Sequence, residues 1–359
     1  MLYRLIYYFH TDYSFLNVFR YITFRTIYAA LTAFLLSLLL GYLIIPRLKR
    51  LHIGQYIRDD GPPDHKNKVG TPTMGGSFLL PSIIISSLLW VEPGNLYIWL
   101  VLLVTVLFGG IGFVDDYLKV IRKSSKGLRV WSKFSMQAGI ALFVGIILYS
   151  YTGFDSRLSF PFFKEFLPDL GIGYILLVIL VVVGASNAVN LTDGLDGLAI
   201  GPIIIAFLSY LAFSYLAGHI KIANYLQIPY VSGAGELSVI CGAVVGAGMG
   251  FLWYNTYPAQ VFMGDAGSLS LGAALGMIAV ISKQEITLIL VGGLFVVEAL
   301  SVIFQVAFFK LTGGRRLLKM APIHHHFELE GWPEPKVTIR FWIIAIMLAL
   351  LSMSTLKLR

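Results

Sequence analysis

The sequence predicts an all-α polytopic integral membrane protein with about ten transmembrane helices. Of its 359 residues, 57% are hydrophobic and only 13% are charged, whereas about 25% of the residues in a soluble domain are charged. Uncharged apolar runs recur along the whole chain, and a helix needs about 20 mostly apolar residues to cross a bilayer. No internal repeat or linker divides the chain, so we expect a single transmembrane domain over residues 1–359.

The N-terminal segment, residues 1–21, differs from the rest because it mixes aromatic residues with Arg4 and Arg20 and lacks a small-residue cleavage site. We therefore expect an interfacial segment rather than a cleaved signal peptide. Ten predicted spans follow, near residues 22–46, 74–91, 97–114, 134–151, 172–188, 198–217, 237–254, 267–282, 286–309 and 338–356. The eighth is short and rich in glycine, which suits close helix packing in a membrane. The one cysteine, Cys241, permits no intrachain disulfide.

The distribution of basic residues predicts the orientation of the chain. The first, third and ninth loops are rich in Lys and Arg, whereas the even-numbered loops carry only Arg157, Lys164, Lys221 and Lys283. Basic residues concentrate on the cytoplasmic side of a membrane protein. The odd-numbered loops should therefore be cytoplasmic and both termini should lie on the outer side of the cytoplasmic (inner) membrane. The net charge of +8 thus reflects membrane orientation, and we expect no nucleic-acid partner.

The polar motifs all fall in these cytoplasmic loops, which predicts one site at the cytoplasmic face. The motif GFVDDYLK places Asp115 and Asp116 where the third span ends. Carboxylates are unfavourable at a helix C-terminus and costly at the end of a span, so this pair needs a reason. Two interpretations remain open: solvated acids compensated by Lys119, or a pair that binds a metal or acts as a base.

The loops NLTDGLDGLA and NTYPAQVFMGDAGS add further acids beside glycines. Asp196 and Asp265 each precede a span, so helix capping would explain both. Capping does not explain Asp193, nor Asn190 and Gly194, and glycine lets a backbone approach a ligand closely. We therefore interpret Asp193 and Asp265 as functional, and capping and function remain equally open for Asp196.

Basic and histidine-rich loops face these acids. HKNKVGTPTMGG combines Lys68 and Thr73 with a span N-terminus, which is typical of an anion site, although an ordinary basic loop is the plainer interpretation. APIHHHFELEGWPEPK carries His324, His325 and His326. Three consecutive side chains cannot all bind one metal ion, but imidazoles can donate to phosphate oxygens.

These residue types indicate oxygen ligands and a hard cation. Mg²⁺ typically binds one or two carboxylates together with substrate phosphates. Phosphoryl transfer needs mainly positioning and charge neutralisation, which Lys68, Lys119 and Lys133 could supply. Phe262, beside Asp265, could stack on a base or be an ordinary interfacial aromatic. A site at the bilayer surface would let a membrane lipid react with a water-soluble partner.

Together the motifs HKNKVGTPTMGG, GFVDDYLK, NAVNLTDGLDGLA, NTYPAQVFMGDAGSL and PIHHHFELEGWPEPKV resemble those of the phospho-N-acetylmuramoyl-pentapeptide-transferases. This family belongs to the polyprenyl-phosphate N-acetylhexosamine-1-phosphate transferases. The resemblance implies ten spans, a homodimer, and the Mg²⁺-dependent first membrane step of peptidoglycan synthesis. In that reaction, phospho-MurNAc-pentapeptide moves from UDP-MurNAc-pentapeptide to undecaprenyl phosphate, which gives lipid I and UMP.

The resemblance also implies roles for individual residues. Asp265 matches a Mg²⁺ ligand, and Asp115, Asp116 and His324 match residues that the reaction requires. Positions that match the nucleotide pocket are Lys68, Asn190, Asp193, Asp196 and Phe262. We add as substrate-binding candidates, from their places in the motifs, Thr73, Lys119, Gly194, Leu195, Asn255, His325 and His326, and from the third loop Lys133.

Three alternatives stay open on the sequence. A sister enzyme would transfer GlcNAc-1-phosphate from UDP-GlcNAc, and TPTMGG and PIHHHFE argue against it. An ion-coupled transporter would carry its acids near the membrane midplane, where only Glu298 lies. A membrane-anchored nucleotide-binding protein would have no turnover. Glu298 itself could be a partner for a neighbouring helix or could line a lipid groove.

Overall fold

The computed structural model describes residues 2–50, 70–122, 127–161, 163 and 166–357. The regular secondary structure of the described residues is helical, and an isolated β-bridge joins Arg157 and Asp169. Nine helical segments in it are long and apolar enough to cross a membrane. They are α2 (Ile22–Arg50), α4 (Leu96–Ile121), α5 (Val130–Ser150), α6 (Tyr174–Thr192), α7 (Ile200–Ala217), α9 (Leu237–Asn255), α10 (Gly264–Ile281), α12 (Gly293–Leu311) and α14 (Glu334–Ser354). The chain is therefore a multi-pass membrane protein.

Three of the ten predicted spans differ from the prediction, and one of them, the third, is longer than expected and forms α4, which ends at Ile121. The second is helix α3 (Gly76–Trp90), which has 15 residues and is shorter than a full crossing requires. The ninth is broken at Gly292 into α11 (Thr287–Val291) and α12. Glycine weakens a helix interior, so a break falls there readily. Short helices α8 (Ile220–Leu226) and α13 (Ile323–Leu329) lie in loops.

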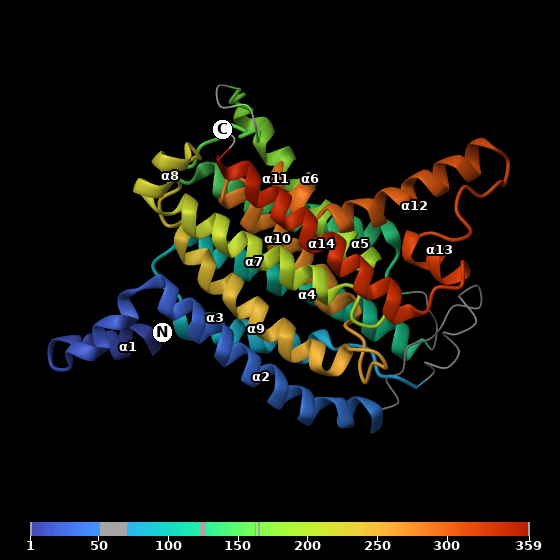
Figure 1. The fold of residues 1–359 in the computed structure, drawn as a ribbon, viewed down its shortest axis with the longest axis horizontal. Helices are drawn as coiled ribbons and strands as arrows, with labels where there is room; N and C mark the ends of the chain where they lie inside the picture. Colours follow the sequence, from blue (N-terminus) through green and yellow to red (C-terminus); the bar gives the residue numbers. More distant parts are fainter. Residues whose placement is uncertain (1, 51–69, 123–126, 162, 164–165, 358–359) are drawn as a thin grey trace.

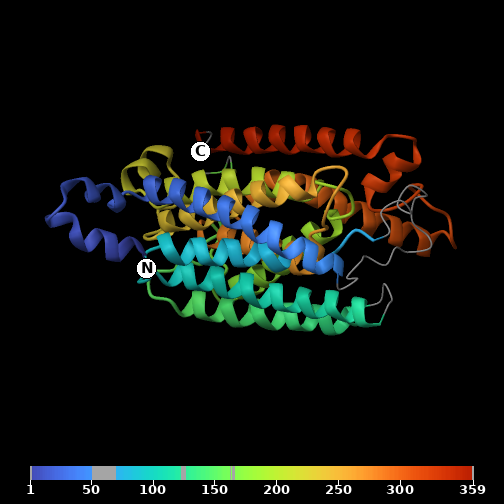
Figure 2. The same ribbon diagram turned by 90° about the horizontal axis from the view of Figure 1, so that it is seen from below.

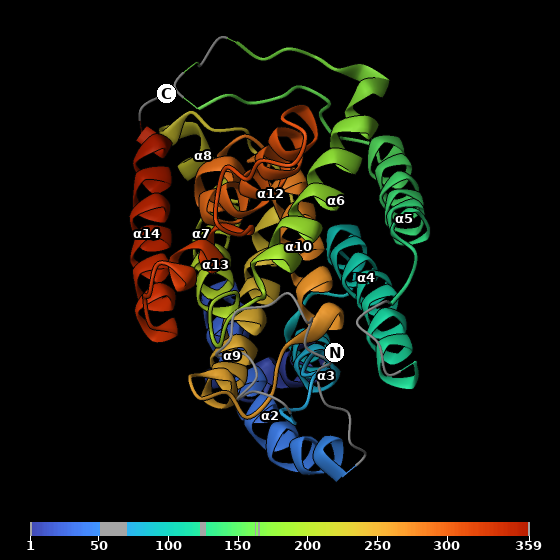
Figure 3. The same ribbon diagram turned by 90° about the vertical axis from the view of Figure 1, so that its right-hand side faces the viewer.

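Helix α10 lies near the centre of the bundle, between α9 and α4 in the view of Figure 3. It packs against α4 and α6, and also against α3 and α7. Nearly all of its residues are buried, and many are glycine, alanine or serine. Small residues let neighbouring helices approach closely, which confirms the packing expected for this glycine-rich span.

The bundle has two distinct ends, which Figures 1 and 2 show from two directions. Helix α1 (Leu2–Tyr8) and the end of α14 lie at one end, and α13 lies at the other. The 18 residues of α10 span about 27 Å at 1.5 Å per residue, close to the roughly 30 Å of a bilayer core. Asp265 lies in the first turn of α10, and Lys283 lies just beyond its last residue. These two residues therefore mark opposite faces of the membrane body.

The N-terminal segment consists of α1 and the short helices Phe9–Thr11 and Ser14–Arg20. Phe19 stacks on Trp90 at the end of α3, with ring centroids 5.9 Å apart. Arg4 forms an ion pair with Glu92. The segment thus packs on the helical body, while Tyr8 and Phe15 remain exposed. Its interfacial location stays a prediction.

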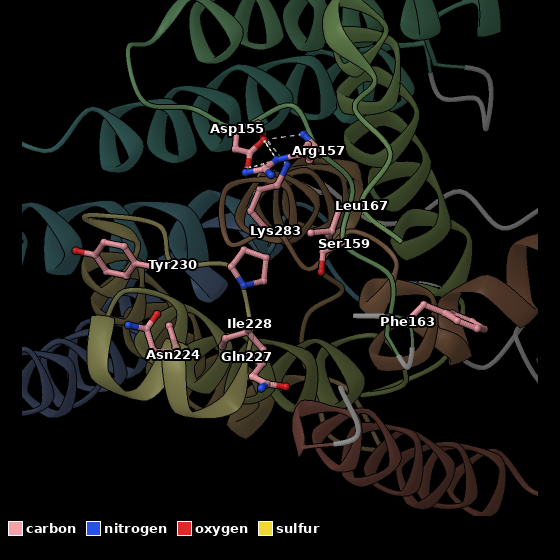
Figure 4. Close-up of a pocket in the computed structure, with 12 residues that line it drawn as sticks. Asp155, Arg157, Ser159, Phe163, Leu167, Asn224, Gln227, Ile228, Tyr230 and Lys283 are labelled. Carbon is pink, nitrogen blue, oxygen red and sulfur yellow. Dashed lines mark hydrogen bonds and ion pairs between the residues drawn. The ribbon is translucent and has the colours of Figure 1, made fainter. Parts of the chain in front are cut away.

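A buried charge network lies at the Lys283 end, beside a cavity of about 530 Å³ (Figure 4). The Lys283 Nζ atom donates to the Asp155 carbonyl at 2.8 Å and to the Tyr174 hydroxyl at 2.9 Å. It also pairs with Glu285 at 3.3 Å. Burial lowers the pKa of Lys283 and raises the pKa of Glu285. The cavity lies at the Lys283 end of α10, whereas Asp265 lies at the other end. The cavity is therefore distinct from the candidate site.

We expect Lys283→Met to destabilise the protein strongly. The change would leave Glu285 buried without its cation, and breaking a buried pair in this way costs about 3–5 kcal/mol. The matched control is Arg157→Met, because Arg157 pairs with Asp155 while both side chains are about half exposed. Thermal unfolding in detergent should give a clearly lower midpoint for Lys283→Met and little change for Arg157→Met. Equal midpoints for the two variants would show that the buried network does not stabilise the fold.

Candidate active site

Three carboxylates converge where α4 meets the N-terminus of α10. Asp115, Asp116 and Asp265 can each offer an oxygen within 4.8 Å of the others. Asp115 and Asp116 are 3% exposed, so both are buried. The Ala266 amide donates to Asp116 at 3.2 Å, and the Leu128 amide donates to Asp115 at 2.7 Å. Acids distant in the sequence therefore form one cluster, and solvation does not explain the pair.

The position of Asp115 and Asp116 within α4 corrects the sequence analysis. The prediction ended the third span near residue 114, which put both acids at a helix C-terminus. Helix α4 continues to Ile121, so both acids lie within the helix and Lys119 lies on its next turn. The reason is that charged residues can extend a membrane helix beyond the apolar run that defines the span. The penalty at a helix end therefore does not apply to this pair.

Two lysines neutralise the acidic cluster. Lys119 Nζ lies 2.6 Å from Asp115 Oδ2 and 3.1 Å from Asp265 Oδ2. Lys133, in the first turn of α5, lies 2.6 Å from the same Asp265 oxygen. From the sequence we expect both lysines to contact phosphate oxygens, but in the structure their ammonium groups contact carboxylates. Three acids and two lysines leave one formal negative charge, which favours a cation.

The last turn of α6 and the loop after it approach the same cluster. Asn190 donates to Asp265 Oδ1 at 3.0 Å and to the Ser268 hydroxyl at 2.9 Å. The Gly264 amide donates to the Asp193 carboxyl group. Loss of solvent around this carboxyl group raises the pKa of Asp193 to about 8, and the charges of Asp265 and Asp116 contribute to the rise. A bound cation would act in the opposite direction.

The capping interpretation of Asp265 and Asp196 is wrong. Helix α10 begins at Gly264 and α7 at Ile200, and neither helix has a side-chain cap. The Asp265 carboxylate instead pairs with Lys119 and Lys133 and accepts a hydrogen bond from Asn190. Asp196 Oδ2 accepts from the Ala259 amide at 2.9 Å, and the Asp196 amide donates to Glu334. Asp196 therefore links the 193–199 turn to the 256–263 loop and to α14. It does not cap α7, because that helix begins only at Ile200.

Asn255 also joins two loops. Its side-chain Oδ1 atom accepts from the Gly197 backbone amide at 3.1 Å, and its side-chain Nδ2 atom donates to the Val261 backbone carbonyl at 2.9 Å. These contacts hold the 193–199 turn against the 256–263 loop. Leu195 is buried in a small apolar cluster with Val337 and Phe341. In this structure Asn255 and Leu195 therefore have packing and positioning roles.

Backbone pairing brings the TPTMGG loop to the site. The Phe262 amide donates to the Pro72 carbonyl at 2.9 Å, and the Gly75 amide donates to the Phe262 carbonyl at 2.8 Å. A Cβ atom placed on Gly264 would lie 2.5 Å from Asp116 Oδ2 and 3.2 Å from Thr73 Oγ1. Thr73 thus lies beside the acidic cluster. The predicted residue Lys68 lies outside the described residues.

The three histidines point to separate partners, as expected for consecutive side chains. His325 Nδ1 lies 2.7 Å from Glu328, and His326 Nδ1 accepts from the Lys319 amide at 3.2 Å. His324 is fully buried and lies 3.1 Å from Glu298 of α12. A Cβ atom on Gly194 would lie 2.3 Å from His324 Nε2. The structure therefore brings His324, and not the whole triplet, against the NLTDGLDG loop.

Two residues of this neighbourhood were not assigned to the site from the sequence. The sequence leaves the role of Glu298 open, although a lone acid within an apolar span is a known functional signal. Glu334 gave no such signal, because it lies in a polar stretch before α14 and its contact with Asp196 depends on the fold.

The comparisons with known proteins define the class. Residues 98–283, more than half of the chain, match the model of the glycosyl transferase family 4. Three curated relatives carry the name phospho-N-acetylmuramoyl-pentapeptide-transferase, and each aligns over the full length of both chains. They come from Syntrophus aciditrophicus (62% identical), Desulforapulum autotrophicum (59%) and Desulfosudis oleivorans (58%). The chain belongs to the family of phospho-N-acetylmuramoyl-pentapeptide-transferases, which confirms the resemblance found in its motifs.

Proposed function

We propose that this protein transfers phospho-MurNAc-pentapeptide from UDP-MurNAc-pentapeptide to undecaprenyl phosphate, which yields lipid I and UMP. The reaction would take place at the cytoplasmic face of the inner membrane, with both termini on the outer side. The observation that carries the proposal is the convergence of three carboxylates and two lysines at one end of a membrane-spanning bundle. The names of the full-length relatives support the same reaction.

The acidic cluster fits a divalent cation, and we propose Mg²⁺. Its donors are carboxylate oxygens, the ligands that Mg²⁺ prefers. Asp265 would be the principal ligand, because both of its oxygens face the cluster and contact Lys119, Lys133 or Asn190. Asp115 and Asp116 would complete the protein's contribution. When bound, the cation would supply charge stabilisation for the phosphoryl oxygens.

The chain's own residues would bind and orient the two substrates. Lys119 and Lys133 contact the carboxylate oxygens that would bind the cation. When the cation binds, both ammonium groups would therefore become available to phosphate oxygens. Asn190 and Asp193 would face the nucleotide, together with Phe262 and Asp196. The alkyl chain of the lipid would lie among the exposed apolar side chains of the membrane helices.

We favour direct attack over a covalent enzyme intermediate. A lipid phosphate is largely ionised at pH 7, because its second pKa lies near 6, and it needs orientation more than activation. Its oxygen would form a bond to the β-phosphorus, and the bond from that phosphorus to the bridging oxygen would break, releasing UMP with the electron pair. Asp115 or Asp116 would orient the attacking phosphate. A chirally labelled β-phosphorus should be inverted, whereas retention would contradict direct attack.

The other interpretations fit less well. The acids cluster at one end of α10, whereas a transporter would place them near the midplane, and Glu298 is held by His324. Transfer from UDP-GlcNAc would suit the same acids, but the full-length relatives carry the muramoyl name. We further propose a homodimer, as the family resemblance implies; light scattering of the purified protein would contradict it by giving the mass of one chain.

Parallel assays of UMP release test the proposed function. Purified protein would receive undecaprenyl phosphate and Mg²⁺ with either UDP-MurNAc-pentapeptide or UDP-GlcNAc. We expect release only with the muramoyl donor, and we expect EDTA to abolish it. Release with UDP-GlcNAc alone would assign the protein to the sister enzymes. A folded sample that releases no UMP from either donor would contradict transferase function and favour a binding protein or a transporter.

A further inference from the structure

Glu298 is a fully buried acid within the apolar helix α12. A charged side chain in such a place is costly, and it usually has a partner and a function. Its Oε1 atom lies 3.1 Å from His324 Nδ1. Its Oε2 atom is buried and makes no hydrogen bond among the described residues. The imidazole of His324 is therefore the group that the structure pairs with this carboxylate.

Glu298 belongs to a polar stripe along one face of α12, formed with Ser301 and Gln305. Residues at this spacing share a helix face. The Ser301 hydroxyl accepts from the Ile323 amide at 3.0 Å, at the start of α13. Gln305 Oε1 accepts from the Leu318 amide at 2.9 Å. All three side chains thus bind the segment that carries the histidines, and the stripe anchors that segment to the membrane body.

The two ring nitrogens of His324 face different neighbours. Nδ1 faces Glu298, while Nε2 has no hydrogen-bond partner among the described residues. A side chain on Gly194 would strike Nε2, with its Cβ atom only 2.3 Å away. The absence of a side chain at Gly194 therefore lets the NLTDGLDG loop and Nε2 approach each other. Nε2 faces the loop whose Asp193 lies beside the acidic cluster.

We propose that Glu298 is a positioning residue that orients His324 and, through it, the NLTDGLDG loop. The carboxylate accepts a hydrogen bond from Nδ1–H and fixes the orientation of the ring, as partners of histidine do in other sites. Nε2 is then held against Gly194, in the loop that carries Asp193. The inference rests on the proposed function and adds to it a residue that acts through His324.

A double-mutant cycle tests whether Glu298 acts through His324. Glu298→Gln keeps the size and a hydrogen-bond acceptor but removes the charge, and we expect kcat/KM for UMP release to fall about 10- to 100-fold. In a His324→Gln background, the same change should cost less than about 2-fold, because coupled residues are not additive. Glu285→Gln is the matched control, because it removes a buried acid at the opposite end of α10, and its effect should be the same in both backgrounds. An equal loss from Glu298→Gln in both backgrounds would overturn the proposal.

A second measurement needs no substrate. In protein labelled with ¹⁵N-histidine, the His324 signal is identified by its loss in His324→Gln, and it should show a protonated Nδ1. Glu298→Gln should change this signal, and Glu298→Asp, which keeps the charge, should largely restore it. An unchanged signal in Glu298→Gln would overturn the proposal. Because this readout is independent of turnover, failure of the proposed function would appear separately, as absent UMP release by the wild-type protein.

Discussion

Replacing Asp265 with asparagine should abolish turnover. Asp265 lies with Asp115 and Asp116 in the acidic cluster. Its carboxylate pairs with Lys119 and Lys133 and accepts a hydrogen bond from Asn190. The asparagine has nearly the same shape and can still accept from Asn190, but it removes the charge that would hold a cation. A bound cation supplies several kcal/mol of charge stabilisation, so UMP release should fall by at least about 10³-fold.

The control for this variant is Glu285→Gln, which removes a buried acid at the opposite end of α10. Glu285 contacts Tyr174 and Lys283 and lies far from the cluster. Any change in UMP release by Glu285→Gln should follow the loss of folded protein seen in thermal unfolding. Full activity of a folded Asp265→Asn variant would show that the acidic cluster is not the reaction site.

The second large effect should come from Gly112→Ala. A Cβ atom at Gly112 would lie 2.2 Å from the Asp265 carbonyl oxygen and 2.5 Å from the Ala266 nitrogen. These contacts are backbone atoms, which cannot move aside by a change of rotamer as a side chain can. Helix α4 and the start of α10 would therefore have to separate. This junction brings Asp115 and Asp116 to Asp265, and a displacement of about 1 Å can cost about 10²-fold in rate. We expect a loss of UMP release of about that size.

Gly110→Ala is the matched control, because Gly110 lies two residues earlier in the same helix. A Cβ atom there meets nothing within 4 Å. Both variants gain the same helix propensity, so they differ only in the contact with α10. UMP release by Gly110→Ala should stay within about 2-fold of wild type. If the two variants lost activity equally, close packing of α4 against α10 would not explain the site.

The spans were predictable from the sequence because each follows from a local property. An apolar run of about 20 residues crosses a bilayer wherever it occurs, whereas its direction, inferred from the basic loops, stays a prediction. The site could be located for the same reason: alternating loops brought the acids near residues 115, 193 and 265 to one face. Local properties did not predict where helices end, so α4 and the break at Gly292 differed from the prediction.

The contacts that assemble the site could not be read from local patterns. Asp196 looked like a helix cap because it precedes a span, but its partners are Ala259 and Glu334. The link from Glu298 to His324 joins two segments 26 residues apart in the sequence. Such pairs depend on how helices and loops pack, and hydrophobic periodicity carries no information about them.

Cation binding to the purified protein tests the central claim most directly. Mn²⁺ can replace Mg²⁺ at oxygen ligands, and its binding can be followed by electron paramagnetic resonance in wild type, Asp265→Asn and Glu285→Gln. The structure predicts one Mn²⁺ site per chain that Mg²⁺ displaces, that Glu285→Gln keeps and that Asp265→Asn loses. Unchanged Mn²⁺ binding in the folded Asp265→Asn variant would contradict the assignment of Asp115, Asp116 and Asp265 as the cation site.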